Sequence, residues 1–128
     1  MQRDFVYVGD VVESLRLSAG NESVFNQTLN VGNGRIVTLA QAGEEMFKLL
    51  GAEPKLNFSG KYRLGDINHA VADTESIKDI LNYCPATSFS DGLKEFVVWA
   101  SENSSAENNI DSVAEKQLVE RNLLRQAQ

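Results

Sequence analysis

The sequence offers few residues for nucleophilic or metal chemistry. A nucleophilic enzyme needs a base beside an activated serine, cysteine or threonine, and His69 is the single histidine among the 128 residues. No Gly-x-Ser-x-Gly motif is present. The one cysteine, Cys84, precedes Pro85 at a predicted helix end, which favours a structural thiol. Zinc needs three or four N, S or O ligands, and no partner spacing accompanies His69. We therefore expect neither a hydrolytic triad nor a metal site.

Two arginines have settings that suit an anion. Arg3 lies at the edge of a predicted short strand and Arg63 lies in a loop that contains glycines, where a guanidinium can bind phosphate oxygens in a fork. From spacing alone, a surface salt bridge between Arg63 and Asp66 is the favoured alternative. Gly32-Asn33-Gly34 lacks the third glycine of a phosphate-binding loop and precedes a strand, so we interpret it as a turn.

The composition predicts one modest soluble domain. Apolar residues make up 42% of the chain and charged residues 23%, which is enough for a core. Twelve Lys and Arg against 18 Asp and Glu leave a net charge of -6, which argues against nucleic-acid and anionic-membrane partners. The chain shows neither an apolar run of about 18–20 residues nor a secretory signal, so a cytoplasmic location is expected.

Hydrophobic periodicity and turn residues predict short strands between helices. Strands are expected at 4–8, 28–31, 35–37 and 55–59, and a polar loop over 60–68. Helices are expected from an Asp10 cap to about residue 19, from a Thr38 cap to about 50, over about 74–82, and from Ser88 or Ser90 to about 100. Residues 1–100 are then one domain, 101–109 a polar linker, and 110 to about 126 a last helix with a loose apolar stripe.

Several motifs, in this order and spacing, resemble the C-terminal half of the NAD-dependent nucleotide-sugar epimerases and dehydratases, of the extended short-chain dehydrogenase/reductase family. The motifs are Gln2-Arg3-Asp4-Phe5-Val6-Tyr7-Val8-x-Asp10-Val11-Val12, Leu29-Asn30-Val31-Gly32-Asn33-Gly34, Tyr62-Arg63-Leu64-Gly65-Asp66-Ile67, Ala72-Asp73-Thr74 and Gly92-Leu93-x-x-Phe96-x-x-Trp99. The resemblance spans about residues 2 to 100 and implies an α+β fold. We expect a small mixed domain of short strands and four to five helices, which is the C-terminal lobe of such a dehydrogenase without its Rossmann domain.

In this family the Rossmann domain holds NAD and a Tyr-x-x-x-Lys pair moves the proton. None of the three tyrosines here has a lysine four residues later. The resemblance therefore implies a substrate-binding fragment that is not an enzyme by itself and holds no cofactor of its own, NAD belonging to the parent proteins.

The resemblance also implies binding residues for a UDP- or dTDP-sugar. Arg3 and Arg63 match the family's two arginines that contact the pyrophosphate, and Asp66 matches a residue that bonds the ribose or orders its loop. Two departures weaken the match, because family members often have Asp at the position of Gly9 and Arg at the position of Asn68. An alternative function is a non-catalytic interaction module. It would self-associate through the surface that a Rossmann domain normally covers.

Overall fold

The computed structural model describes residues 1–103 and 110–126, which form a small mixed α+β domain. The helices within these residues are α1 (Val8–Ser18), α2 (Leu39–Leu49), α3 (Glu75–Leu81), α4 (Phe89–Asn103) and α5 (Ile110–Glu120), with one 3-10 turn at Glu22–Val24. The strands are β1 (Gln2–Arg3), β2 (Val37–Thr38), β3 (Lys61–Arg63), β4 (His69–Ala70) and β5 (Leu124–Gln126). The expected fold class is confirmed. None of the described helices is long and apolar enough to cross a membrane.

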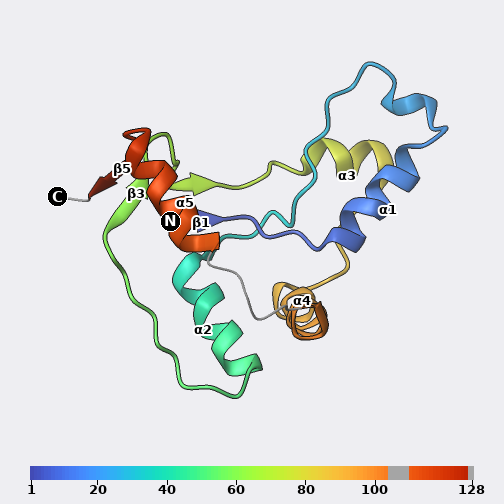
Figure 1. The fold of residues 1–128 in the computed structure, drawn as a ribbon. Helices are drawn as coiled ribbons and strands as arrows, with labels where there is room; N and C mark the ends of the chain where they lie inside the picture. Colours follow the sequence, from blue (N-terminus) through green and yellow to red (C-terminus); the bar gives the residue numbers. More distant parts are fainter. Residues whose placement is uncertain (104–109, 127–128) are drawn as a thin grey trace.

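Two small sheets connect distant parts of the chain. In the first, the strand order is β2-β1-β4, with β1 antiparallel to β2 and parallel to β4. In the second, β3 pairs antiparallel with β5. Figure 1 shows α1 and α3 together at one end of the molecule, while α2 and α4 lie below the first sheet. Two later segments of the chain, β2 and β4, therefore flank the N-terminal strand β1.

The second helix begins and ends where the sequence predicts. The Thr38 hydroxyl accepts a hydrogen bond from the Gln41 amide at 3.1 Å, and the Gln41 side-chain oxygen accepts one from the Thr38 amide at 2.9 Å. This reciprocal pair is a capping box. Gly51 follows the helix with a φ of 64°, a backbone conformation that favours glycine.

The predicted strand at 4–8 is wrong, because none of these residues lies in a strand. The strand ends at Arg3, and the first helix already begins at Val8 and includes Gly9. A Cβ at Gly9 would lie 2.6 Å from the Tyr7 ring, so a larger residue at this position would require the Tyr7 side chain to move. Asp10 does not cap the helix from outside, because it lies inside the first turn and is buried.

The predicted strands at 28–31 and 55–59 are absent from the described structure, and a strand forms instead inside the predicted polar loop over 60–68. This strand, β3, is exposed along its whole length and its partner, β5, comes from the far end of the sequence. No local hydrophobic pattern marks β3, because its pairing rather than burial makes it a strand.

The last part of the chain also differs from its prediction. The predicted helix over 110–126 ends at Glu120, and Asn122 adopts a left-handed φ of 53°. Asparagine tolerates this conformation and commonly ends helices. The chain then reverses into β5. Helix α4 continues to Asn103, three residues past the predicted boundary at 100, and the rest of the predicted linker, 104–109, lies outside the described residues.

The described core is small and lies between α1 and α3. Ile77, Leu81 and Tyr83 are buried, and partly buried side chains pack around them, among them Leu17. The Tyr83 hydroxyl donates a hydrogen bond to the Asp10 carbonyl oxygen at 3.0 Å. The phenol therefore fixes the end of α3 to the start of α1.

Two carboxylates near the N-terminus hold loops that the sheets do not reach. Asp4 accepts hydrogen bonds from the amides of Asn33, Gly34 and Ala72 at 2.7, 2.9 and 3.1 Å. Asp10 accepts them from the amides of Ala86 and Thr87, both at 3.1 Å. Each carboxylate satisfies backbone donors that would otherwise lack partners.

We expect Asp4→Asn to lower the free energy of unfolding by about 1.5–3 kcal/mol, because an amide group offers one acceptor oxygen where the carboxylate offers two. Urea unfolding measures this loss. The control is Asp79→Asn, which changes an exposed aspartate on α3 and should move stability little. Equal stabilities of the two variants would contradict the role of Asp4.

Tyr83 should make stability depend on alkaline pH. Burial raises the pKa of the Tyr83 phenol above its usual value, and the nearby Asp10 charge adds to the shift. The folded protein keeps the phenol protonated to higher pH than the unfolded chain does. This contribution is therefore complete below a pH of about 10 and is lost as pH rises through the folded pKa.

We accordingly expect Tyr83→Phe to cost about 1 kcal/mol at neutral pH, through its lost hydrogen bond, and to flatten the alkaline fall in stability. Urea unfolding at several pH values measures both effects. Tyr62→Phe is the control, since Tyr62 is 41% exposed. The role of Tyr83 is contradicted if its variant loses stability above a pH of about 10 as steeply as the parent does.

Candidate functional site

Arg3 occupies the central strand of the first sheet. Its side chain is half-buried, and its guanidinium donates a hydrogen bond to the Gln2 carbonyl oxygen at 2.8 Å. No carboxylate among the described residues forms an ion pair with it. A guanidinium carries five N–H donors, so most of them remain for a ligand.

Arg63 and Asp66 lie on the second sheet and the turn that follows it. Arg63 ends β3 and is exposed, and the Asp66 amide donates to the Arg63 carbonyl oxygen at 3.0 Å. This bond closes a turn at Leu64-Gly65, and Gly65 has a φ of 95°, which suits glycine. The alternative salt bridge between the Arg63 and Asp66 side chains does not form within the described structure.

The parallel pairing of β1 with β4 connects the two arginine positions. β4 begins at His69, six residues after Arg63, and His69 is the register partner of Gln2. The Gln2 amide also donates to the Asn68 carbonyl oxygen at 2.8 Å. Because an extended residue spans about 3.3–3.6 Å, at most about 20 Å of backbone separates Arg63 from this pairing. The loop that carries Asp66 therefore leads into β4, the neighbour of the strand that carries Arg3.

The Gly32-Asn33-Gly34 turn cannot bind a phosphate as it stands. The amides of Asn33 and Gly34 already donate to the Asp4 carboxylate. A Cβ at Gly32 would lie 2.4 Å from the Ala72 side chain, so the glycine is required for close packing rather than for ligand approach. These residues therefore do not fit the pyrophosphate of NAD.

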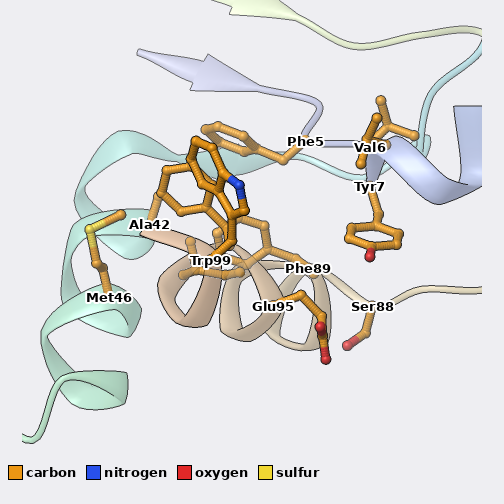
Figure 2. A pocket seen from close by; sticks show the side chains of 13 residues that line it. Phe5, Val6, Tyr7, Ala42, Met46, Ser88, Phe89, Glu95 and Trp99 are labelled. Carbon is orange, nitrogen blue, oxygen red and sulfur yellow. The ribbon is translucent and has the colours of Figure 1, made fainter. Parts of the chain in front are cut away.

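An apolar cavity of about 690 Å³ opens between the segment before α1 and the helices α2 and α4. Figure 2 shows the Phe5, Phe89 and Trp99 rings around it, Met46 of α2 on one side, and Glu95 and Ser88 at its edge. The Phe5 and Phe89 ring centroids are 5.3 Å apart. Arg3, Arg63 and Asp66 do not line this cavity.

Helices α2 and α4, which border this cavity, are also linked by a hydrogen bond. The Ser90 hydroxyl donates to a Glu45 carboxylate oxygen at 2.6 Å and so joins α4 to α2. This hydrogen bond, helped by nearby Lys48, lowers the pKa of the Glu45 carboxyl below its usual value. Sequence patterns indicated only an amphipathic helix here. The aromatic residues spaced along 89–99 were the signal that could have suggested a cavity.

The residues considered for other chemistry lie apart from one another. His69 is exposed on β4, where its ring nitrogen Nδ1 forms a hydrogen bond of 2.5 Å with the Gln2 side-chain oxygen. Cys84 is an exposed free thiol. Among the described residues, no three His, Cys, Asp or Glu side chains are placed to hold a metal ion.

No family model matches the sequence, whereas individual relatives do. An uncharacterized UDP-glucose epimerase of Bacillus subtilis is 29% identical over 77% of this chain and 31% of that protein. An uncharacterized protein of Methanocaldococcus jannaschii is 33% identical over 80% of this chain and 31% of its own length. The chain thus spans about a third of the curated relatives it matches.

Solved structures share the fold. MoeE5, in complex with UDP-glucuronic acid and NAD, matches with a TM-score of 0.69 and 27% identity, over 80% of this chain and 34% of that one. A dTDP-glucose 4,6-dehydratase from Bacillus anthracis, in complex with NAD, matches with a TM-score of 0.70 and 23% identity, over 80% of this chain and 32% of that one. The similarity again covers most of this chain and about a third of each neighbour.

Proposed function

We propose that this chain, which is a part of a nucleotide-sugar epimerase or dehydratase, binds the diphosphate of a nucleotide sugar and does not catalyse the reaction by itself. Arg3 and Arg63 supply the positive charge, and Asp66 accepts a hydrogen bond from the ribose or holds the loop in place. The ligand is a UDP-sugar or a dTDP-sugar, since the relatives include a UDP-glucuronate epimerase and a dTDP-L-rhamnose epimerase.

The observation that carries this proposal is the pairing of β1 with β4. The loop of Arg63 and Asp66 leads into β4, which pairs with the strand of Arg3, and neither guanidinium forms an ion pair with a carboxylate among the described residues. Two unpaired guanidinium groups suit a diphosphate, because each can donate two parallel hydrogen bonds to its oxygens. MoeE5 was solved with UDP-glucuronic acid, which supports a nucleotide-sugar ligand for this chain.

Two features of the sequence and the structure support the proposal that the chain does not catalyse by itself. Hydride transfer requires a bound nicotinamide, and the one glycine turn that resembles a phosphate loop is occupied by Asp4. A tyrosine with a lysine four residues later is also absent from the sequence.

We expect Arg63→Ala to weaken UDP binding by about 1.5–3 kcal/mol, since it removes a charge-assisted contact to phosphate. Isothermal titration calorimetry of the full chain with UDP and with dTDP measures the change. The matched control is Arg35→Ala, which removes an exposed arginine before β2. The proposal fails if the parent chain binds neither nucleotide, or if both variants lose the same affinity.

The apolar cavity favours self-association as a second function. Val8, Phe96 and Trp99 line it and are 69%, 49% and 59% exposed. Contiguous exposed apolar surface of this kind commonly marks an interface. We propose that a second copy of the chain covers this face, as the alternative drawn from the sequence expects.

We expect the chain to form dimers whose fraction rises with concentration, and Phe96→Ser to shift it toward the monomer. Light scattering after size-exclusion chromatography measures the mass. Phe58→Ser is the control, because Phe58 is 73% exposed and lies outside the cavity. A parent chain that stays monomeric at high concentration would rule out this second function.

A further inference from the structure

The end of the chain folds onto the strand that carries Arg63. β5 pairs with β3 in the register Lys61↔Gln126, Tyr62↔Arg125 and Arg63↔Leu124. Beyond the ladder, the Leu64 amide donates to the Leu123 carbonyl oxygen at 2.6 Å, and the Gln126 side chain donates to the Ser59 carbonyl oxygen at 3.0 Å. β5 is the ladder partner of β3 in the described structure, so the C-terminal segment fixes the backbone at Arg63.

Side chains on a strand alternate between its two faces, so Lys61 and Arg63 share one face while Tyr62 lies on the other. Helix α5 places a carboxylate against the first of these cations. The Lys61 ammonium nitrogen lies 2.5 Å from a Glu115 carboxylate oxygen. An acidic group from the C-terminal segment therefore already occupies the cationic face of β3.

The Lys61–Glu115 pair can open at little cost. Its two side chains are 46% and 52% exposed, and exposed ion pairs stabilise proteins only weakly. The hydrogen bond and charge of Lys61 lower the pKa of the Glu115 carboxyl below its usual value, so the carboxylate stays charged at neutral pH. A ligand with phosphate oxygens offers Lys61 the same kind of partner with more charge.

We infer that Lys61 is a third cationic contact for the diphosphate and that Glu115 is an internal competitor for it. The inference rests on the proposed function, because it names a further residue of the same anion site. Binding then exchanges one carboxylate for a phosphate at Lys61, while the β3–β5 ladder keeps Arg63 in place. Residues 110–126 thus set the affinity of a site that they do not themselves form.

The test is calorimetric titration of the full chain with UDP and, separately, with inorganic pyrophosphate at low salt. We expect Glu115→Gln to bind both about two- to fivefold more tightly and Lys61→Gln to bind them about three- to tenfold more weakly. In the double variant Lys61→Gln/Glu115→Gln, the gain in affinity from Glu115→Gln should vanish, because the ammonium group with which Glu115 pairs is no longer present. The matched control is Glu120→Gln, which removes the same charge from an exposed position on α5.

Four results would overturn the inference. Glu115→Gln could bind like Glu120→Gln, which would mean that only net charge matters, or its gain could persist without Lys61. If Arg63→Ala weakens UDP binding while Glu115→Gln changes nothing, the inference fails and the proposed function stands. If no variant binds either probe, the proposed function fails first and the inference with it. Hydrogen exchange at Leu64 checks the fold of each variant, since its amide should stay protected.

Discussion

The fold depends on backbone amides that donate to two aspartates near the N-terminus. Asp4 gathers amides from Asn33, Gly34 and Ala72, and Asp10 gathers amides from Ala86 and Thr87. The strands of the first sheet are two residues long, so their ladders alone give few bonds between distant segments. The described core is equally small. Charge-assisted hydrogen bonds to the backbone therefore do much of the work that buried apolar surface does in larger domains.

This constraint explains how the candidate anion site is arranged. The turn at 32–34 is committed to Asp4, so it holds the scaffold and leaves phosphate binding to side chains elsewhere. Arg3 lies on β1. The loop that carries Asp66 leads into β4, which pairs with β1. The similarity covers about a third of the length of each curated relative.

Local signals in the sequence predicted the helices better than the strands. Thr38 before the helix and Gly51 after it predicted the bounds of α2, because a helix depends on neighbours within a few residues. β3 had no such signal, since its partner lies some sixty residues away and its side chains are exposed. For the same reason, no local sequence pattern predicted the ion pair of Lys61 with Glu115. Arg3, Arg63 and Asp66 came from family resemblance, and their roles remain predictions.

The pairing of β3 with β5 has a consequence for the order of folding. Residue 61 can find its ladder partner only after residue 126 has been synthesised, and closing so long a loop costs considerable chain entropy. The capping box of α2 and the turn at Asn122 need only nearby residues and can form early. On the ribosome, the strand of Arg63 therefore waits unpaired until residues 124–126 have been synthesised. During that interval its free edge is open to other strands.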